Sequence, residues 1–207
     1  MSYTFEEFEK NLGYEFKDKE LLKLAFTHTT YVFEHHQKHY ESNQRLEFVG
    51  DAVLDLVIGQ KLYELKPHAD EGYLSKTRSL VVCERSLASV ARKLRVGELL
   101  MLGKGEAQSG GADKDSTLSD VVESFIAAVY FDAGFAEAER VILKNLSDII
   151  DDFKNSIQCV LTLLGGIQQL ANSILTFVGC FLNLTVLIGK LDRTICRLLY
   201  NIIDCGC

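Results

Sequence analysis

Proline, tryptophan and cysteine are scarce in most of this 207-residue chain. There is one proline, Pro67, there is no tryptophan, and the first 155 residues hold a single cysteine, Cys83. The lack of helix-breaking prolines, together with long stretches of apolar residues at helical spacing, favours a mostly helical protein. A single cysteine is consistent with a reducing compartment. The residues from Met1 to Glu7 lack an apolar segment, which argues against a secretory signal, so a cytoplasmic location is expected.

Basic residues are fewer than acidic residues. Lysine and arginine number 22 against 29 acidic residues, which gives a formal net charge of −7. Phosphate contacts normally supply most of a protein's affinity for nucleic acid, so charge alone favours a small-molecule or protein partner. That argument weakens if several carboxylates form a site for divalent cations, or if an accessory basic domain supplies the attraction.

Charged residues are missing altogether between residues 156 and 189, and five of the six cysteines lie in the last 49 residues. We therefore place a boundary near Phe153, with a globular domain over 1–153 and an atypical apolar tail, helical or disordered, over 154–207. Three interpretations of the tail stay open: an aberrant or poorly ordered segment, a helical hairpin packed on a partner or on the core, and a membrane anchor. The interpretation as a membrane anchor is weakened by polar residues within the uncharged stretch, which are Gln158, Gln168, Gln169, Asn172 and Asn183.

The first 153 residues predict an all-α domain. The expected helices begin at Thr4, and run from Asp18 to Phe26, from Ser42 or Asn43 to Leu65, from Asp70 through Ser75 to Leu94, from Asp115 or Ser116 to Asp132, and from Ala136 to Phe153. Their starts carry residues whose side chains cap helices, and Thr4 with Glu7 has the spacing of a capping box. The helix ending at Leu65 is apolar on several sides, so we expect it at the centre of the domain. Residues 28–40 have no clear period and 103–111 are rich in glycine, so both are expected to be loops.

Two of the expected helices carry pairs of acidic residues. Glu47 and Asp51 are four residues apart, and Asp120 and Glu123 are three apart, so each pair lies on one face of its helix. Like charges at these spacings are mildly destabilising, and both pairs stand in apolar sequence, where an unpaired carboxylate is costly. If the two helices pack side by side, the four carboxylates form a site for a hard divalent cation such as Mg²⁺. The alternative, that these acids pair with lysine or arginine or face solvent, stays open on spacing alone.

Several motifs in a fixed order carry a family resemblance. They are Asn43-Gln44-Arg45-Leu46-Glu47-Phe48-Val49-Gly50-Asp51-Ala52-Val53-Leu54, Asp70-Glu71-Gly72 with Leu74, Ser75 and Arg78, Leu102-Gly103-Lys104-Gly105-Glu106, Gly110-Gly111, Ser116-Thr117-Leu118-Ser119-Asp120-Val121-Val122-Glu123, and Ile126 to Asp132 with Gly134. This series resembles the ribonuclease III family over roughly residues 5–150. The resemblance implies the all-α helical fold of the ribonuclease III endonuclease domain.

The resemblance also implies a role for each acid. Glu47, Asp120 and Glu123 match ligands of Mg²⁺, for which Mn²⁺ is a plausible substitute. Asp51 and Glu123 match the catalytic set, with Asp51 orienting the attacking water and Glu123 the acid whose loss most damages cleavage. Glu71 matches a secondary acidic position near the cleft. An acid in the first turn of a helix is equally well explained by the helix dipole.

The implied activity is Mg²⁺-dependent hydrolysis of double-stranded RNA, including precursors of ribosomal RNA and other structured RNAs. The implied assembly is a homodimer with one active site for each strand. Phe48 would then belong to the dimer contact, or alternatively to the core. A non-catalytic protein that binds double-stranded RNA or assists assembly is the alternative function, although such a protein has no need of four intact carboxylates. A helical metal-binding or structural protein is a third and weaker alternative.

Other residues give weaker signals. Lys104, Lys114 and Arg78 are candidates for phosphate contacts, although each is also compatible with a solvated charge. The three histidines between 35 and 39 are better explained as solvated side chains than as a metal cluster, because no cysteine accompanies them in that loop.

The chain also departs from the family pattern. Gln44 stands where many relatives have an acid, and the segment before Ser116 is unusually acidic. The largest departure is the tail 154–207, which does not resemble the basic double-stranded-RNA-binding domain of bacterial members. After Lys154 at its start, its only cations are Lys190, Arg193 and Arg197.

Overall fold

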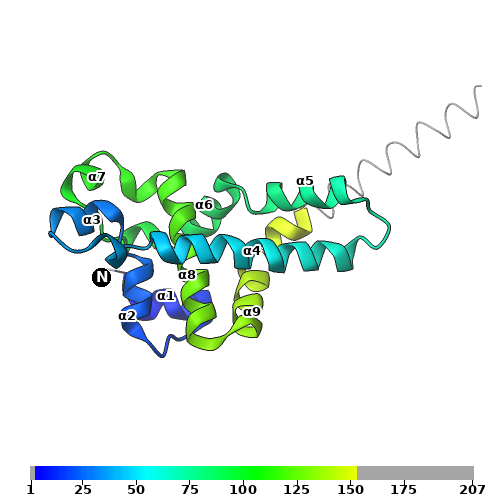
Figure 1. The fold of residues 1–207 in the computed structure, drawn as a ribbon, viewed down its shortest axis with the longest axis horizontal. Helices are drawn as coiled ribbons and strands as arrows, with labels where there is room; N and C mark the ends of the chain where they lie inside the picture. The colour runs from blue at the N-terminus through cyan, green and yellow to red at the C-terminus, as the bar shows by residue number, and fades with distance from the viewer. Residues whose placement is uncertain (1–2, 153–207) are drawn as a thin grey trace, which may run out of the picture. The chain divides into compact units, whose positions relative to one another are not determined.

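The computed structural model describes residues 3–152, and this part of the chain is all-α (Figure 1). Its α-helices are α1 (Phe5–Leu12), α2 (Lys19–Ala25), α3 (Thr29–Glu34), α4 (Gln44–Leu65), α5 (Glu71–Val81), α6 (Glu84–Lys93), α7 (Lys104–Gln108), α8 (Asp115–Ala133) and α9 (Phe135–Asn145). Short 3-10 helices lie at His39–Glu41, Val96–Glu98 and Gly111–Asp113. The only β-type pairing within residues 3–152 is one isolated parallel bridge between Thr27 and Met101.

Side-chain caps fix several helix starts as the sequence predicts. Thr4 and Glu7 form a capping box at α1, in which the Glu7 amide donates to Thr4 Oγ1 and the Thr4 amide donates to Glu7 Oε2. Asp18 accepts two backbone N–H groups at the start of α2, and Asp70 accepts the Tyr73 N–H at the start of α5. Asn43 occupies the N-cap position of α4, but its side chain makes no capping hydrogen bond. The predicted start of α4 is therefore right, although the side-chain cap expected there is not observed.

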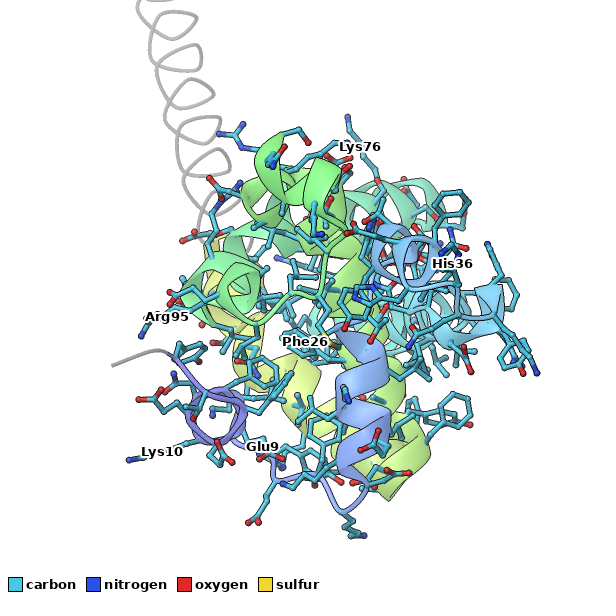
Figure 2. The ribbon with its side chains drawn as sticks, turned by 90° about the vertical axis from the view of Figure 1, so that its left-hand side faces the viewer. Glu9, Lys10, Phe26, His36, Lys76 and Arg95 are labelled. Atoms are coloured by element: carbon cyan, nitrogen blue, oxygen red, sulfur yellow. The ribbon has the colours of Figure 1, made fainter. Side chains whose placement is uncertain are left out.

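The long helices α4 and α8 form the centre of the domain, and they pack against each other more extensively than any other pair of elements (Figure 1). Eleven of the nineteen residues of α8 are buried, which agrees with its largely apolar sequence. Phe8, Phe26 and Phe125 join α1 and the end of α2 to this centre through edge-to-face contacts, with ring centroids 5.0 and 5.5 Å apart. Figure 2 shows Phe26 in the interior, whereas Lys10 and His36 lie at the periphery.

Four boundaries differ from the sequence predictions. The segment expected as a loop over 28–40 contains α3, and the glycine-rich segment 103–111 contains α7. The helix expected to continue from 75 to 94 is two helices, because extended backbone at Cys83 (φ −67°, ψ 155°) separates α5 from α6. α9 ends at Asn145 rather than at Phe153, and helical residues resume over 147–152 after a bend at Leu146.

Within residues 3–152, no helix has both the length and the apolar character that a membrane span requires. The three interpretations of the tail 154–207, and the boundary near Phe153, concern residues outside or at the edge of the described part and stay predictions.

Candidate active site

The first part of the site comes from α4. Glu47, Asp51 and Asp55 follow one another at intervals of four residues, so all three lie along one face of the helix. The neighbouring side of α4, about 100° around the helix axis, is buried through Leu46, Gly50 and Leu54, which fixes the rotation of the helix about its axis. The row of acids is therefore held in one direction by the packing of the core.

The second part comes from α8, which meets α4 at Gly50. A Cβ atom on Gly50 would lie 1.8 Å from the carbonyl oxygen of Glu123 and 2.9 Å from its Cα, so only glycine allows the two backbones to approach this closely. Gly50 stands between Glu47 and Asp51, and Glu123 is itself one of the predicted acids. The two helices that carry the acid pairs are therefore in backbone contact at this point, so the predicted side-by-side packing of the helices is observed.

Electrostatics show that the four carboxyl groups interact. Burial, followed by the charges of Asp51, Asp120 and Glu47, raises the pKa of Glu123 to about 8, with a smaller contribution from Asp55. A carboxylic acid with this pKa holds its proton at neutral pH unless a cation takes the proton's place. Strongly shifted carboxyl groups of this kind are typical of functional sites.

The neighbouring acids are shifted in the same direction. Burial, followed by the charges of Asp120 and Asp51, raises the pKa of Glu47. Burial also raises the pKa of Asp120, to which the charge of Glu84 adds, whereas the charge of Lys114 opposes the increase. Two acids that sequence reasoning did not include, Asp55 and Glu84, therefore influence the site. The fourfold spacing on α4 could have identified Asp55, but no sequence pattern marks Glu84, which comes from the start of α6.

Basic partners do not neutralise this group in the described part of the chain. None of the salt bridges among residues 3–152 involves Glu47, Asp51, Asp120 or Glu123. Nor do any three Asp, Glu, His or Cys side chains within that range stand close enough together to hold one metal ion. The chemistry of the donors nevertheless suits Mg²⁺, which prefers carboxylate oxygens and binds through one or two of them while keeping several waters. A bound cation would also relieve the mutual repulsion that raises these pKa values.

Glu71 lies apart from this group. It is exposed at the first position of α5, where its Oε1 accepts a hydrogen bond of 2.8 Å from Ser75 Oγ. α5 runs antiparallel along the C-terminal half of α4, so the start of α5 lies near the C-terminal end of α4 (Figure 1). Glu71 belongs to the first turn of α5, whereas Glu47 belongs to the first turn of α4. Glu71 does not contribute to the pKa shifts of Glu47, Asp120 or Glu123. Within one chain the structure therefore does not bring Glu71 to the other predicted acids.

The structure also locates the aromatic, basic and histidine residues that the sequence singled out. Phe48 is 80% exposed, so the alternative that it is a core residue is wrong for this chain. Arg78 pairs with Asp55 at 3.5 Å, and Lys104 pairs with Glu34 at 3.5 Å. The three histidines between 35 and 39 are exposed.

Comparison with known proteins supports the same family. A family profile described as ribonuclease-III-like matches residues 18–150. Ribonuclease 3 of Caldanaerobacter subterraneus subsp. tengcongensis is 48% identical over 149 residues, which cover 72% of this chain and 65% of that protein. Ribonuclease 3 of Geobacillus thermodenitrificans is 43% identical over 162 residues, which cover 74% of this chain and 66% of that protein. The match thus spans slightly less than two thirds of the length of these relatives.

Solved structures agree with the sequence comparison. The nuclease domain of ribonuclease III from Campylobacter jejuni has 41% sequence identity and a TM-score of 0.65, and the match covers 70% of this chain and 95% of that domain. The fold also resembles that of Dicer from Pichia stipitis, with a TM-score of 0.50 at 24% identity. The described helices, the paired acids on α4 and α8 and these similarities together show that the chain belongs to the ribonuclease-III-like family.

Proposed function

We propose that this chain is an endoribonuclease that hydrolyses phosphodiester bonds of double-stranded RNA with the help of Mg²⁺. The observation that carries the proposal is the backbone contact of α4 with α8 at Gly50, together with the raised pKa of Glu123, to which the charges of Asp51, Asp120 and Glu47 contribute. A cluster of like charges without a basic partner in the described part destabilises a fold, so a purely structural role does not explain it. Binding a divalent cation beside a phosphodiester does explain it.

Three of the acids suit the metal site. Glu47, Asp120 and Glu123 would hold Mg²⁺, and Mn²⁺, which also accepts carboxylate oxygens, would replace it. When bound, such a cation lowers the pKa of a coordinated water and stabilises the charge that develops on the phosphate. Glu123 must release the proton on its carboxyl group to serve as a ligand, and its raised pKa makes that step dependent on pH and on cation concentration.

Asp51 suits a different task. It is exposed, unlike the half-buried Glu47 and Glu123, and it raises the pKa of both. An exposed carboxylate beside the metal ligands can accept a hydrogen bond from the attacking water and orient it toward the phosphorus. Asp51 is therefore the residue we assign to water positioning.

A homodimer would place two such sites on one RNA duplex. The exposed side of α4 carries Phe48 and Leu56, which are 80% and 58% exposed, and Tyr63 further along is 72% exposed. Phe48 and Leu56 are eight residues apart and so lie on one face of the helix, which makes an apolar strip suited to a second copy of the chain. A second structure of the Campylobacter jejuni nuclease domain is described as flexible in the region involved in dimer formation. In the proposed dimer, each site cuts one strand.

The substrate would be recognised by shape. A-form RNA offers phosphates and 2′-hydroxyl groups rather than readable bases, so structured precursors such as those of ribosomal RNA are the proposed substrates. Such substrates, and the single free cysteine Cys83 among the described residues, agree with a cytoplasmic location. With a net charge of −7, binding should be weak at physiological salt and strongest at low salt.

The direct test is cleavage by the full chain at low salt. A 30-base-pair RNA duplex labelled on both strands would be compared with single-stranded RNA and with a DNA duplex, each in Mg²⁺ and in EDTA. The proposal predicts cuts in both RNA strands, in Mg²⁺ only, with little action on the other two substrates. Binding of the RNA duplex without cleavage under any metal condition would overturn it and favour the non-catalytic RNA-binding alternative.

A further inference from the structure

Among three candidate cations for phosphate contacts, the structure singles out Lys114. Arg78 is engaged by Asp55 and Lys104 by Glu34, each at 3.5 Å. The Lys114 ammonium, in contrast, makes no salt bridge or side-chain hydrogen bond with any of residues 3–152. Its charge is therefore available to a ligand.

Lys114 is free because Arg92 of α6 occupies the acids on both sides of it. Arg92 Nε donates to Asp113 Oδ1 at 2.7 Å, and its NH2 group donates to the Asp113 carbonyl at 2.7 Å and to Asp115 Oδ1 at 2.6 Å. Asp113 and Asp115 are the acids nearest to Lys114 in sequence, and Arg92 engages both. Three charge-assisted hydrogen bonds from one planar guanidinium also hold the backbone on either side of Lys114.

The turn that precedes Lys114 is packed closely against its surroundings. A Cβ atom on Gly97 would lie 2.2 Å from the carbonyl oxygen of Ala112, and one on Gly111 would lie 2.5 Å from Cγ of Glu106. Glycine at these two positions lets the turn lie against the backbone of residue 97 and the side chain of Glu106. Together with the Arg92 contacts, this packing fixes the backbone from which the exposed Lys114 side chain extends.

Lys114 stands at the end of α8 that leads to the acids. It is the N-cap residue of this helix, six residues before Asp120. Its charge opposes the increase in the pKa of Asp120, and it adds to the decrease that burial causes in the pKa of half-buried His28. It is the only cation that contributes to the resolved pKa shifts of Glu47, Asp120 and Glu123. An RNA backbone approaching this acidic site would meet one positive charge there.

We propose that Lys114 binds a phosphate of the RNA backbone next to the carboxylate site, and that Arg92 positions it by holding Asp113 and Asp115. This inference rests on the proposed function, because it assumes that the ligand is RNA. Lys114 is assigned as a binding residue, and Arg92, which would not itself contact the RNA, as a positioning residue.

The test measures how the binding of an RNA duplex depends on salt. Full-length wild type, Lys114→Gln, Lys114→Arg and Arg92→Gln would be titrated against a fluorescent RNA duplex in Ca²⁺ at several KCl concentrations. Lys93→Gln is the matched control, because it removes one positive charge from α6, where Lys93 pairs with Asp148 at 2.7 Å. Circular dichroism would confirm that each variant is folded.

A plot of log K, where K is the association constant, against log salt concentration has a negative slope. Loss of one phosphate contact decreases the magnitude of this slope by about 0.9. Lys114→Gln should show that decrease and bind about eightfold more weakly at 0.1 M salt, which is the same slope change expressed at that concentration. Lys114→Arg should retain the wild-type slope, Arg92→Gln should fall in between, and Lys93→Gln should match wild type. If wild type binds the duplex and Lys114→Gln has its slope, the Lys114 assignment is wrong. If wild type does not bind the duplex at all, the proposed function fails instead.

Discussion

Gly50 on α4 lies directly against the backbone of Glu123 on α8, so close that a Cβ atom on Gly50 would stand 1.8 Å from the Glu123 carbonyl oxygen. This contact sets the separation of the two helices that carry the acids. It also explains why a glycine, which weakens a helix, stands in the middle of one of the longest helices of the domain. The geometry of the site thus depends on a residue that has no side chain to contribute.

Gly50→Ala should therefore damage both stability and activity. The added methyl group meets backbone atoms, which cannot move aside as a side chain can, so we expect a loss of roughly 1–3 kcal/mol in the free energy of unfolding. Displacement of Glu47 and Asp51 relative to Glu123 by about 1 Å would lower the cleavage rate by about 100-fold. Urea denaturation and single-turnover cleavage would measure the two effects.

Gly59→Ala on the same helix is the matched control. There the added methyl group would meet only Arg78 side-chain atoms, at 3.8 Å, which is an ordinary contact. Alanine should then raise stability by up to about 1 kcal/mol through its better helix propensity, with cleavage unchanged. Equal effects of the two substitutions would contradict the account of the Gly50 contact.

Glu123 should make the stability of the metal-free protein depend on pH. In the folded chain the Glu123 carboxyl group keeps its proton up to about pH 8, whereas in the unfolded chain it releases the proton near pH 4.5. The folded state therefore binds more protons between these values, and the free energy of unfolding falls as pH rises from about 4.5 to about 8. Glu123→Gln cannot ionise and should be the more stable protein at pH 8, by about 1–2 kcal/mol after allowance for solvent screening.

Thermal denaturation in EDTA at pH 4.5 and pH 8 would show this effect. We expect the Tm of Glu123→Gln to exceed that of wild type by about 2–6 °C at pH 8 and to match it at pH 4.5. Added Mg²⁺ should then raise the Tm of wild type at pH 8 more than that of the variant, since binding to the folded state stabilises it. A wild-type Tm that Mg²⁺ leaves unchanged would count against the metal site.

The apolar strip on α4 should control the oligomeric state. Phe48→Asp places a charge at the most exposed position of the strip, so the proposed dimer should dissociate at least 100-fold more readily, which is about 3 kcal/mol of interface free energy. Sedimentation equilibrium of the full chain would measure the dissociation constant. Phe33→Asp is the control, because Phe33 is 85% exposed but belongs to α3, away from the strip. Dissociation by both substitutions, or by neither, would contradict the assignment.

Glu71 should matter far less than the four central acids. Its carboxylate is exposed and accepts a hydrogen bond from Ser75, and its helix, α5, starts near the C-terminal end of α4 (Figure 1). Glu71→Gln should therefore change the single-turnover cleavage rate by less than about threefold, which is under 1 kcal/mol of activation free energy. A loss of 100-fold or more would show that Glu71 joins a site that one chain does not complete by itself.

The sequence predicted those parts of the fold that depend on local signals. Caps at Thr4, Asp18 and Asp70 gave helix starts correctly, because these residues act on backbone groups a few positions away. The break at Cys83 was missed because neither glycine nor proline marks it. The change of direction there lets α6 pack on α8, and such tertiary packing overrides helix propensity.

For the candidate site, too, only the features that depend on local sequence could be predicted. Spacing placed Glu47 with Asp51 and Asp120 with Glu123, because the period of a helix is a local property. The influence of Glu84 and Lys114 on Asp120 could not be predicted, because it depends on how α6 and the turn before α8 pack. Glu9 is a similar case: a charged residue on a surface helix is 5% exposed because the Lys19 ammonium, 2.6 Å away, and the Phe16 N–H both bind it.

Glu123 offers the most direct test of the central claim, that the carboxyl groups of α4 and α8 form the active site of a ribonuclease. Single-turnover cleavage of a labelled RNA duplex in Mg²⁺ at low salt would be compared between the full chain and Glu123→Gln, with binding of the duplex and thermal denaturation measured on the same samples. We predict that Glu123→Gln remains folded and binds the duplex but cleaves it at least 1,000-fold more slowly, a change of about 4 kcal/mol in activation free energy. Cleavage by Glu123→Gln at the wild-type rate would contradict the claim.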